Sequence, residues 1–384
     1  MFIAADEWGY FYMQCLRIQR VMTAGPVLVA MALALAACGS SSSSSTSSSS
    51  SSGGSSSSSL SGTLNGSGST FQLTFQQTAI SSFKSVQPGL TVNYGGGGSG
   101  KGRTDLASGV VNYAGSDSPI PAAEMAGFKG KTVLYFPVVI GPITVSYNLP
   151  GVKNLKLSAP VLADIFQAKI TKWNDSAIAA DNPGVSLPST AIVIARRSDS
   201  SGTTQNFSEF LVKAAPSVWK LGTDSTIAWP ANSRGGNGNG GVAQIVKTTP
   251  GAIGYVDYAD AKASGLTFAA IKNQAGSYIA PSTQSATAAA DNATIEPNLT
   301  FSAIWAPGAS SYPITYQSWD LVYQAQSSSQ TAKGLQAYIG YLLGPGQKLL
   351  PQLGYAPLPS SLDQKATAQL SKIGSSSAAS ASPS

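Results

Sequence analysis

Ala-Arg-Arg-Ser-Asp-Ser-Ser-Gly-Thr-Thr-Gln-Asn-Phe-Ser-Glu-Phe, residues 195–210, is the most informative stretch of this chain. It begins at the end of an apolar run, residues 191–195, which predicts a buried strand. After a turn rich in glycine and hydroxyl groups, apolar residues recur at helical spacing: Phe207, Phe210, Leu211 and Ala214. The pattern predicts a strand, a tight turn and a helix, with Ser200 or Ser201 as the N-cap.

This arrangement suits a small anion. A helix N-terminus presents unpaired backbone N–H groups and the positive end of a dipole. The hydroxyls of Ser201 and Thr203 add donors, and an arginine at 196 or 197 adds a forked charge that matches a tetrahedral oxyanion. On this stretch alone, an ordinary capped helix with surface arginines explains the pattern equally well.

Two further stretches repeat the same logic. Residues 65–71 form a Gly/Ser turn that feeds a helical pattern, with Ser69 or Thr70 at its start. A predicted strand at 90–94 runs into four successive glycines, which allow a backbone to approach a ligand closely, and then into a helical segment. Three turns that each start a helix can converge on one oxyanion.

The remaining segments predict an α/β fold. The long apolar run at 132–148 predicts strands buried on both faces of a sheet. Residues 111–119 predict a short strand that ends at Asp117, which can equally be a turn aspartate or a helix cap. Residues 172–180 are predicted to be helical, whereas the polar segment 273–298 is predicted to be a loop.

Composition excludes several kinds of chemistry. The 384 residues carry a net charge of +6, only 10% are charged, and there is no histidine. The lack of histidine excludes Ser-His-Asp and Cys-His catalysis and every His-ligated metal site. No run rich in lysine and arginine exists, so a nucleic-acid partner is not expected.

The N-terminus predicts export and anchoring. An apolar run at 27–37, too short to span a bilayer, ends in Leu-Ala-Ala-Cys-Gly, which resembles a bacterial lipoprotein signal. We expect a signal peptide at 1–37, then a lipidated Cys38 and a serine-rich tether through residue 59, with Met1, Met13 or Met22 as the start. A plain signal peptide with an incidental cysteine is the alternative. Residues 373–384 are expected to be a disordered tail.

Four motifs, in this order and spacing, resemble the PstS-like solute receptors of bacterial phosphate ABC importers. They lie at 66–71, 94–102, 114–117 and 196–203, within a likeness that covers nearly all of residues 60–363. The resemblance implies an α/β fold of the two-lobe periplasmic-binding-protein type (type II), with a two-strand hinge. The first lobe would comprise 60–146 and 313–372, and the second 147–312.

By motif, the resemblance implies a phosphate site shared by both lobes, with no cofactor, no metal and no catalytic residue. One lobe would supply Thr70, the Phe71 N–H, Ser99 and Asp117; the other would supply Arg197, Ser201, the Gly202 N–H and Thr203, with Asp199 orienting Arg197. Asp117 would accept the proton that phosphate carries and sulfate lacks, because a site built around such a bond rejects the analogue.

Two departures from the family pattern leave these ligands in place. Lys101 stands where a small residue is common, and an Asn239-Gly240 pair leads us to leave that loop out of the predicted site. The implied protein is a monomeric, lipid-anchored receptor in the periplasm or on the extracytoplasmic face of the plasma membrane, and it hands phosphate to permease subunits. An extracellular phosphatase and a surface-interaction protein on the same fold are the alternatives.

Overall fold

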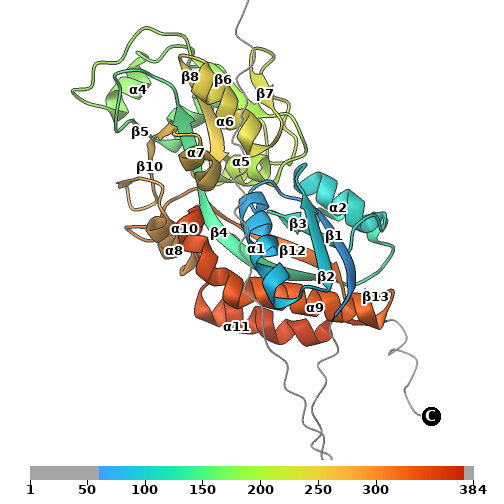
Figure 1. Ribbon diagram of the computed structural model, residues 1–384. Coiled ribbons are helices and arrows are strands. Elements are labelled where there is room, and N and C mark those ends of the chain that lie inside the picture. Colours follow the sequence, from blue (N-terminus) through green and yellow to red (C-terminus); the bar gives the residue numbers. More distant parts are fainter. Residues whose placement is uncertain (1–59, 376–384) are drawn as a thin grey trace, which may run out of the picture. The chain divides into compact units, whose positions relative to one another are not determined.

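The computed structural model describes residues 60–375. Its main feature is a nine-stranded sheet with the order β2-β1-β3-β12-β4-β8-β6-β7, in which the short β9 also pairs with β4 (Figure 1). The strands are β1 (Gly62–Gly68), β2 (Leu90–Gly95), β3 (Tyr113–Ser116), β4 (Val133–Tyr147), β6 (Val193–Arg197), β7 (Arg234–Gly236), β8 (Ala252–Asp257), β9 (Thr267–Phe268) and β12 (Thr315–Tyr323).

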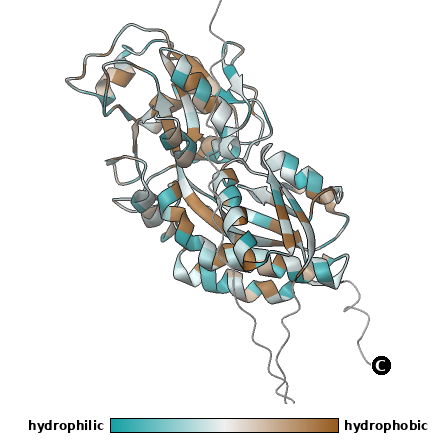
Figure 2. Ribbon diagram, viewed as in Figure 1, coloured by the Kyte–Doolittle hydropathy of each residue, from teal (hydrophilic) through white to brown (hydrophobic). Residues whose placement is uncertain are grey.

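Strand β4 belongs to both halves of the sheet. It pairs antiparallel with β12 up to Pro142 and with β8 from Ile143 onward. Fourteen of its fifteen residues are buried, as the unbroken apolar run predicts for a strand covered on both faces, and Figure 2 shows its hydrophobic character. The predicted strand at 132–148 is confirmed, and the change of partner marks where the chain crosses between halves.

A second connection lies beside this crossing. The Ile143 N–H donates to the carbonyl of Ile314, and the Tyr312 hydroxyl donates to the carbonyl of Ile143, both at 2.8 Å. The chain thus returns next to β4 just before β12 begins. Two adjacent strand segments join the halves, as the two-lobe fold requires, while the exact lobe boundaries at 146 and 313 stay predictions.

Each half combines parallel strands with helices. In the first half β1 pairs parallel with β2 and β3; in the second β6 pairs parallel with β7 and β8. The helices that contact these strands are α1 (Leu73–Val86), α2 (Ser99–Ala107) and α9 (Ser329–Leu343) in the first half, and α5 (Gly202–Ala214) and α6 (Gly238–Thr248) in the second. The predicted α/β class and two-lobe fold are confirmed.

Aromatic side chains fill the core beneath the site-bearing turn. The rings of Phe207 and Tyr255 stack with centroids 4.6 Å apart, and Phe166 meets Phe207 edge-on at 4.8 Å. All three side chains are fully buried. The helix predicted from the spacing of Phe207, Phe210 and Leu211 is confirmed, and its buried face packs against β8.

Two secondary-structure predictions are wrong in part. Residues 172–180 were expected to be helical, but α4 covers only Ser176–Asp181, and Lys172 instead forms a β-bridge with Ala191. The segment 273–298 contains helix α8 (Thr283–Ala290), which Ser282 and Ser285 cap reciprocally. Its apolar residues are all alanines, so the contrast between its faces is weak and the periodicity is hard to detect.

The tail prediction also needs a correction. Ile373 is buried, and β14 (Gly374–Ser375) pairs with β13 (Ala325–Gln326), so ordered structure extends through residue 375. The predicted signal peptide at 1–37, the lipidated Cys38 with its tether at 38–59, and the rest of the tail lie outside the described residues. Between residues 60 and 375, no helix has the length and apolar character needed to cross a bilayer.

Candidate functional site

The turn before α5 forms as predicted, with Ser201 as the N-cap. The Ser201 hydroxyl oxygen accepts a hydrogen bond from the Thr204 N–H at 3.1 Å. Gly202 and Thr203 are then the first two residues of the helix, where backbone N–H groups have no intrahelical acceptor. Ser201 and Thr203 are completely buried, so the donors of this turn lie inside the protein rather than on its surface.

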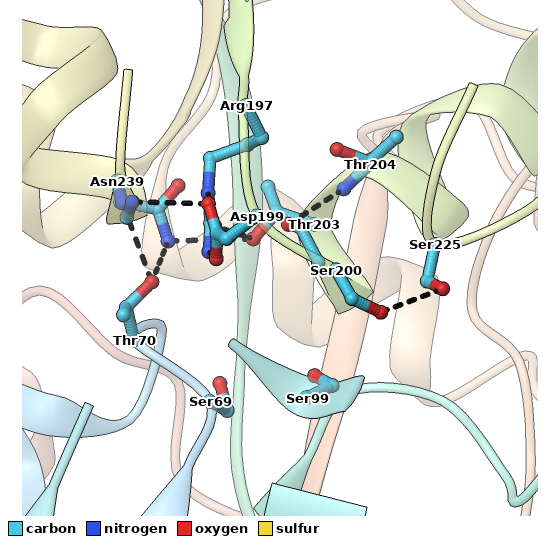
Figure 3. A network of polar contacts seen from close by, with 12 residues as sticks. Ser69, Thr70, Ser99, Arg197, Asp199, Ser200, Thr203, Thr204, Ser225 and Asn239 are labelled. Atoms are coloured by element: carbon cyan, nitrogen blue, oxygen red, sulfur yellow. Dashed lines mark hydrogen bonds and ion pairs between the residues drawn. The ribbon is translucent and has the colours of Figure 1, made fainter. Parts of the chain in front are cut away.

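Arg197 ends β6 and is fixed by Asp199. Its Nε donates to Asp199 Oδ1 at 2.8 Å, its second terminal nitrogen bonds the other carboxylate oxygen, and its Nη1 lies 3.3 Å from Thr203 Oγ1 (Figure 3). Burial raises the pKa of Asp199, but the hydrogen bonds and charge of Arg197 outweigh burial and lower it. Asp199 is thus an ionised partner that orients the guanidinium.

Ser99 and Asp117 form a reciprocal pair in the first half. The Asp117 N–H donates to Ser99 Oγ at 3.1 Å, and Ser99 Oγ lies 3.3 Å from Asp117 Oδ2. Ser99 opens α2, and Asp117 directly follows β3, so a helix start and a strand end meet here. Both side chains are buried, and Asp117 is only 1% exposed.

Burial and hydrogen bonding act in opposite directions on the pKa of Asp117. Burial raises the pKa of its carboxyl, while hydrogen bonds from Ser318, Ser69 and Ser99 and the charge of Arg197 lower it; the net shift is upward. A buried carboxylate is costly unless it is hydrogen-bonded. This one has several donors, so it can act as an acceptor within an otherwise donor-rich site.

Thr70 and Phe71 lie at the start of the first turn, but the helix begins later than predicted. Helix α1 starts at Leu73, and the Phe71 N–H donates to Ser69 Oγ at 3.0 Å. The predicted donor at Phe71 therefore has an acceptor within the protein. The Phe71 ring stacks on Tyr316 with centroids 4.0 Å apart, which fixes this turn against β12.

Asn239 is the site residue that sequence reasoning missed. It is completely buried at the start of α6, and its Nδ2 lies 3.2 Å from Thr70 Oγ1 and 3.3 Å from Thr203 Oγ1 (Figure 3). It thus joins one predicted ligand from each half. The signal for it was present, because a glycine-rich turn before a helix is the pattern that identified the other three turns.

The two halves are in direct contact across the site. Gly202 packs against Asp117 so closely that an added Cβ would lie 2.6 Å from the Asp117 Cβ. The Asn206 Nδ2 donates to the Asp117 carbonyl at 2.7 Å, and the Gly100 N–H donates to the Ser200 carbonyl at 3.1 Å. Lys101 Nζ lies 2.5 Å from Asp105 Oδ2, one turn further along α2, so Lys101 forms an ion pair within its own helix.

One feature unites the hydroxyls of the site: each oxygen accepts a hydrogen bond from a protein N–H. Thr204 donates to Ser201, and Asp117 donates to Ser99. Asn239 donates to the hydroxyls of both Thr70 and Thr203. Because a hydroxyl has a single proton, those of Thr70, Ser201 and Thr203 are left free to donate that proton to a bound acceptor. Ser99 instead directs its proton to Asp117 Oδ2. The site is therefore an array of donors in which the Asp117 carboxylate is an acceptor, suited to a protonated oxyanion.

The fold and site define a two-lobe binding protein for a small oxyanion. A family model for the PBP superfamily domain matches residues 53–345. The chain is 36% identical over 313 residues to the phosphate-binding protein PstS of Pasteurella multocida, covering 80% of this chain and 89% of that one. It is 33% identical over 370 residues to PstS3 of Mycobacterium bovis, covering 93% and 100%. The chain belongs to the PstS family of phosphate-binding proteins.

A solved structure supports the same fold. The high-affinity periplasmic phosphate-binding protein PfluDING, bound with phosphate, matches with a TM-score of 0.67 at 21% sequence identity, covering 80% of this chain and 93% of that one. At this identity the likeness concerns the fold.

Proposed function

We propose that this protein binds inorganic phosphate between its two lobes and delivers it to the permease of a phosphate ABC importer. The observation that carries the proposal is the composition of the site: oriented hydroxyls, a helix N-terminus and Arg197 surround the buried carboxylate of Asp117. Membership of the PstS family supports the same function.

Eight residues are assigned as phosphate ligands. Four come from the first lobe and four from the second, so binding and lobe closure depend on each other. They are Thr70, Phe71, Ser99 and Asp117, then Arg197, Ser201, Gly202 and Thr203. Phe71 and Gly202 would contribute backbone N–H groups, and the Phe71 group would have to exchange Ser69 Oγ for a ligand oxygen.

Asp117 gives the site its selectivity. Phosphate carries at least one proton near neutral pH, and that proton can be donated to the carboxylate. Sulfate carries none, so it would place its lone pairs against those of Asp117 with no proton between them. A buried acceptor facing another acceptor loses its hydrogen bond and its solvation together, which makes rejection strong.

The wider biology follows from this function. We propose that Cys38 carries a lipid anchor and that the serine-rich segment 38–59 holds the binding domain away from the membrane on its extracytoplasmic side. The protein would act as a monomer, without a cofactor. A phosphatase activity on this site is disfavoured, since the chain has no histidine to act as a base for Ser201.

Isothermal titration of the purified full chain with phosphate and with sulfate near neutral pH tests the proposal. We expect binding of phosphate and no detectable binding of sulfate, and altered selectivity in Asp117→Asn, where an amide replaces one carboxylate oxygen. Val212→Thr, at an exposed position on α5, is the control and should bind as the unsubstituted chain does. Absence of heat and of a thermal shift with phosphate would show that the site assignment is wrong.

A further inference from the structure

A line of buried hydrogen bonds connects Asp117 to the neighbouring strand β12. Ser318 Oγ lies 2.6 Å from Asp117 Oδ1, and Gln72 Nε2 lies 3.0 Å from Ser318 Oγ. Gln76 Nε2 lies 2.7 Å from Gln72 Oε1 and 3.0 Å from Asp320 Oδ2. All five side chains are buried, so none of these contacts competes with water.

The neighbours of this line fix its direction. The Nε2 of Gln72 also lies 3.3 Å from the carbonyl of Trp319, and a carbonyl can only accept, so this end of the amide must be the NH2 group. At the far end, the Asp320 carboxylate accepts from Gln76, and the Tyr338 hydroxyl donates to Gln76 Oε1 at 2.6 Å. Both amides therefore have one orientation that satisfies every partner.

This direction determines where the single proton of Ser318 goes. Since its oxygen already accepts from Gln72, the proton is directed to Asp117 Oδ1 at 2.6 Å, a closer acceptor than the Ser116 carbonyl at 3.3 Å. The other carboxylate oxygen, Oδ2, faces Ser99 and Gly202, where the two lobes meet. Asp117 is thereby held as an acceptor, with Oδ1 bonded to Ser318 and Oδ2 at the contact between the lobes.

We propose that Ser318, oriented by Gln72, is a positioning residue that sets the anion selectivity of the site by keeping Asp117 unprotonated. The inference rests on the proposed phosphate function. A protonated Asp117 could donate a hydrogen bond to sulfate and admit it. The donor at Ser318 opposes that state, because its hydrogen bond to the charged carboxylate is stronger than a hydrogen bond to the neutral acid and therefore favours the ionised form.

Few charged groups act on Asp117 besides this hydrogen bond. The titratable groups that interact with the carboxylate are Arg197, Tyr94, Tyr316 and Tyr355. Burial raises the pKa of each of the three tyrosines well above its ordinary value, so all three stay neutral. Burial raises the pKa of Asp117, and the hydrogen bond from Ser318 lowers it more than any other hydrogen bond does. Removing Ser318 should therefore raise the pKa of Asp117 further.

The test is a sulfate titration by calorimetry of the full chain at several values between about pH 5 and pH 8, with phosphate titrated in parallel. Ser318→Ala removes the donor. Ser146→Ala is the matched control, because Ser146 is a buried serine on β4 whose hydroxyl bonds Thr144 at 2.7 Å. Gln72→Met is a second variant that leaves Ser318 in place but removes the group that orients it.

We expect Ser318→Ala to begin binding sulfate about one to two pH units higher than the unsubstituted chain, as the loss of a hydrogen bond to a charged group implies. Gln72→Met should move the profile in the same direction by less, and Ser146→Ala should leave it unchanged. The inference is overturned if Ser318→Ala binds phosphate but gives the same sulfate profile as the control. If Ser318→Ala does not fold, the same outcome for Gln72→Met overturns it. Absence of phosphate binding in the unsubstituted chain would instead overturn the proposed function itself.

Discussion

Gly202 is the position where a single methyl group should weaken binding most directly. A Cβ added there would lie 2.4 Å from Ser99 Oγ, 2.6 Å from Asp117 Cβ and 2.7 Å from Asp117 Oδ2. Real Cβ atoms essentially never approach another heavy atom within 3.0 Å, so the closest of these contacts is too short by 0.6 Å. Gly202→Ala must therefore push the start of α5 away from Ser99 and Asp117.

The expected size of the effect follows from overpacking. Inserting a methyl group into a closely packed site typically costs about 1–3 kcal/mol. If the strain falls on the closed, phosphate-bound state, this corresponds to a Kd for phosphate that is roughly 5- to 150-fold weaker. The stability of the ligand-free chain should change less, because the lobes can relieve the contact by separating.

Calorimetry with phosphate and thermal unfolding without it measure the two effects separately. Gly240→Ala is the matched control: Gly240 also lies in the first turn of a second-lobe helix, but a Cβ there meets nothing within 4 Å. We expect the control to bind phosphate normally and to be as stable as the unsubstituted chain or slightly more so. Normal phosphate affinity in Gly202→Ala would refute the close approach of the lobes at this point.

Three further predictions concern residues around the site. Burial raises the pKa of Asp320 to about 7, so the native state holds a proton that the unfolded state releases, and stability should fall as pH rises from about 4 to about 7. Asp320→Asn should remove up to about 4 kcal/mol of that decline, measured by urea unfolding at the two ends of the range. Asn239→Ala should weaken phosphate binding about tenfold, measured by calorimetry, because the hydroxyls of Thr70 and Thr203 lose their common donor. Phe207→Ala should cost about 3–5 kcal/mol of unfolding free energy in a urea titration, since its ring is fully buried.

Much of the site was predictable because the chemistry of each turn is local. Ser201, Gly202 and Thr203 lie together at a helix start, and the strand before them and the apolar spacing after them reveal that start without any knowledge of the fold. The same holds for Ser99 behind its glycines. Backbone donors at helix starts depend on neighbours in sequence, so a sequence pattern is enough to find them.

Other parts could not be predicted, because their partners are remote in sequence. Ser318 contacts Asp117 across 201 positions, and nothing around Ser318 marks it as polar and buried for a purpose. Asn239 was left out since its glycine-rich turn departs from the family pattern, although the turn itself was visible. The sequence shows that Asp117 ends a strand, but only the neighbouring strand shows which of its oxygens bonds Ser318.

The residues proposed to set selectivity, Ser318 and Asp117, both lie in the first lobe. Ser318 and Asp117 lie on the same side of the lobe crossing, since Trp319 of β12 is in register with Ser116 of β3. Their hydrogen bond therefore does not depend on how far the lobes have closed. Asp117 is held as an acceptor before any ligand arrives.

The contacts from the second lobe behave differently. Gly202, Asn206 and Asn239 reach residues of the first lobe across the site, so these contacts form only as the lobes meet. Closure then adds donors to an acceptor whose state is already set. Under the proposed function, Asp117 is therefore already an acceptor when the second lobe brings its donors to the anion.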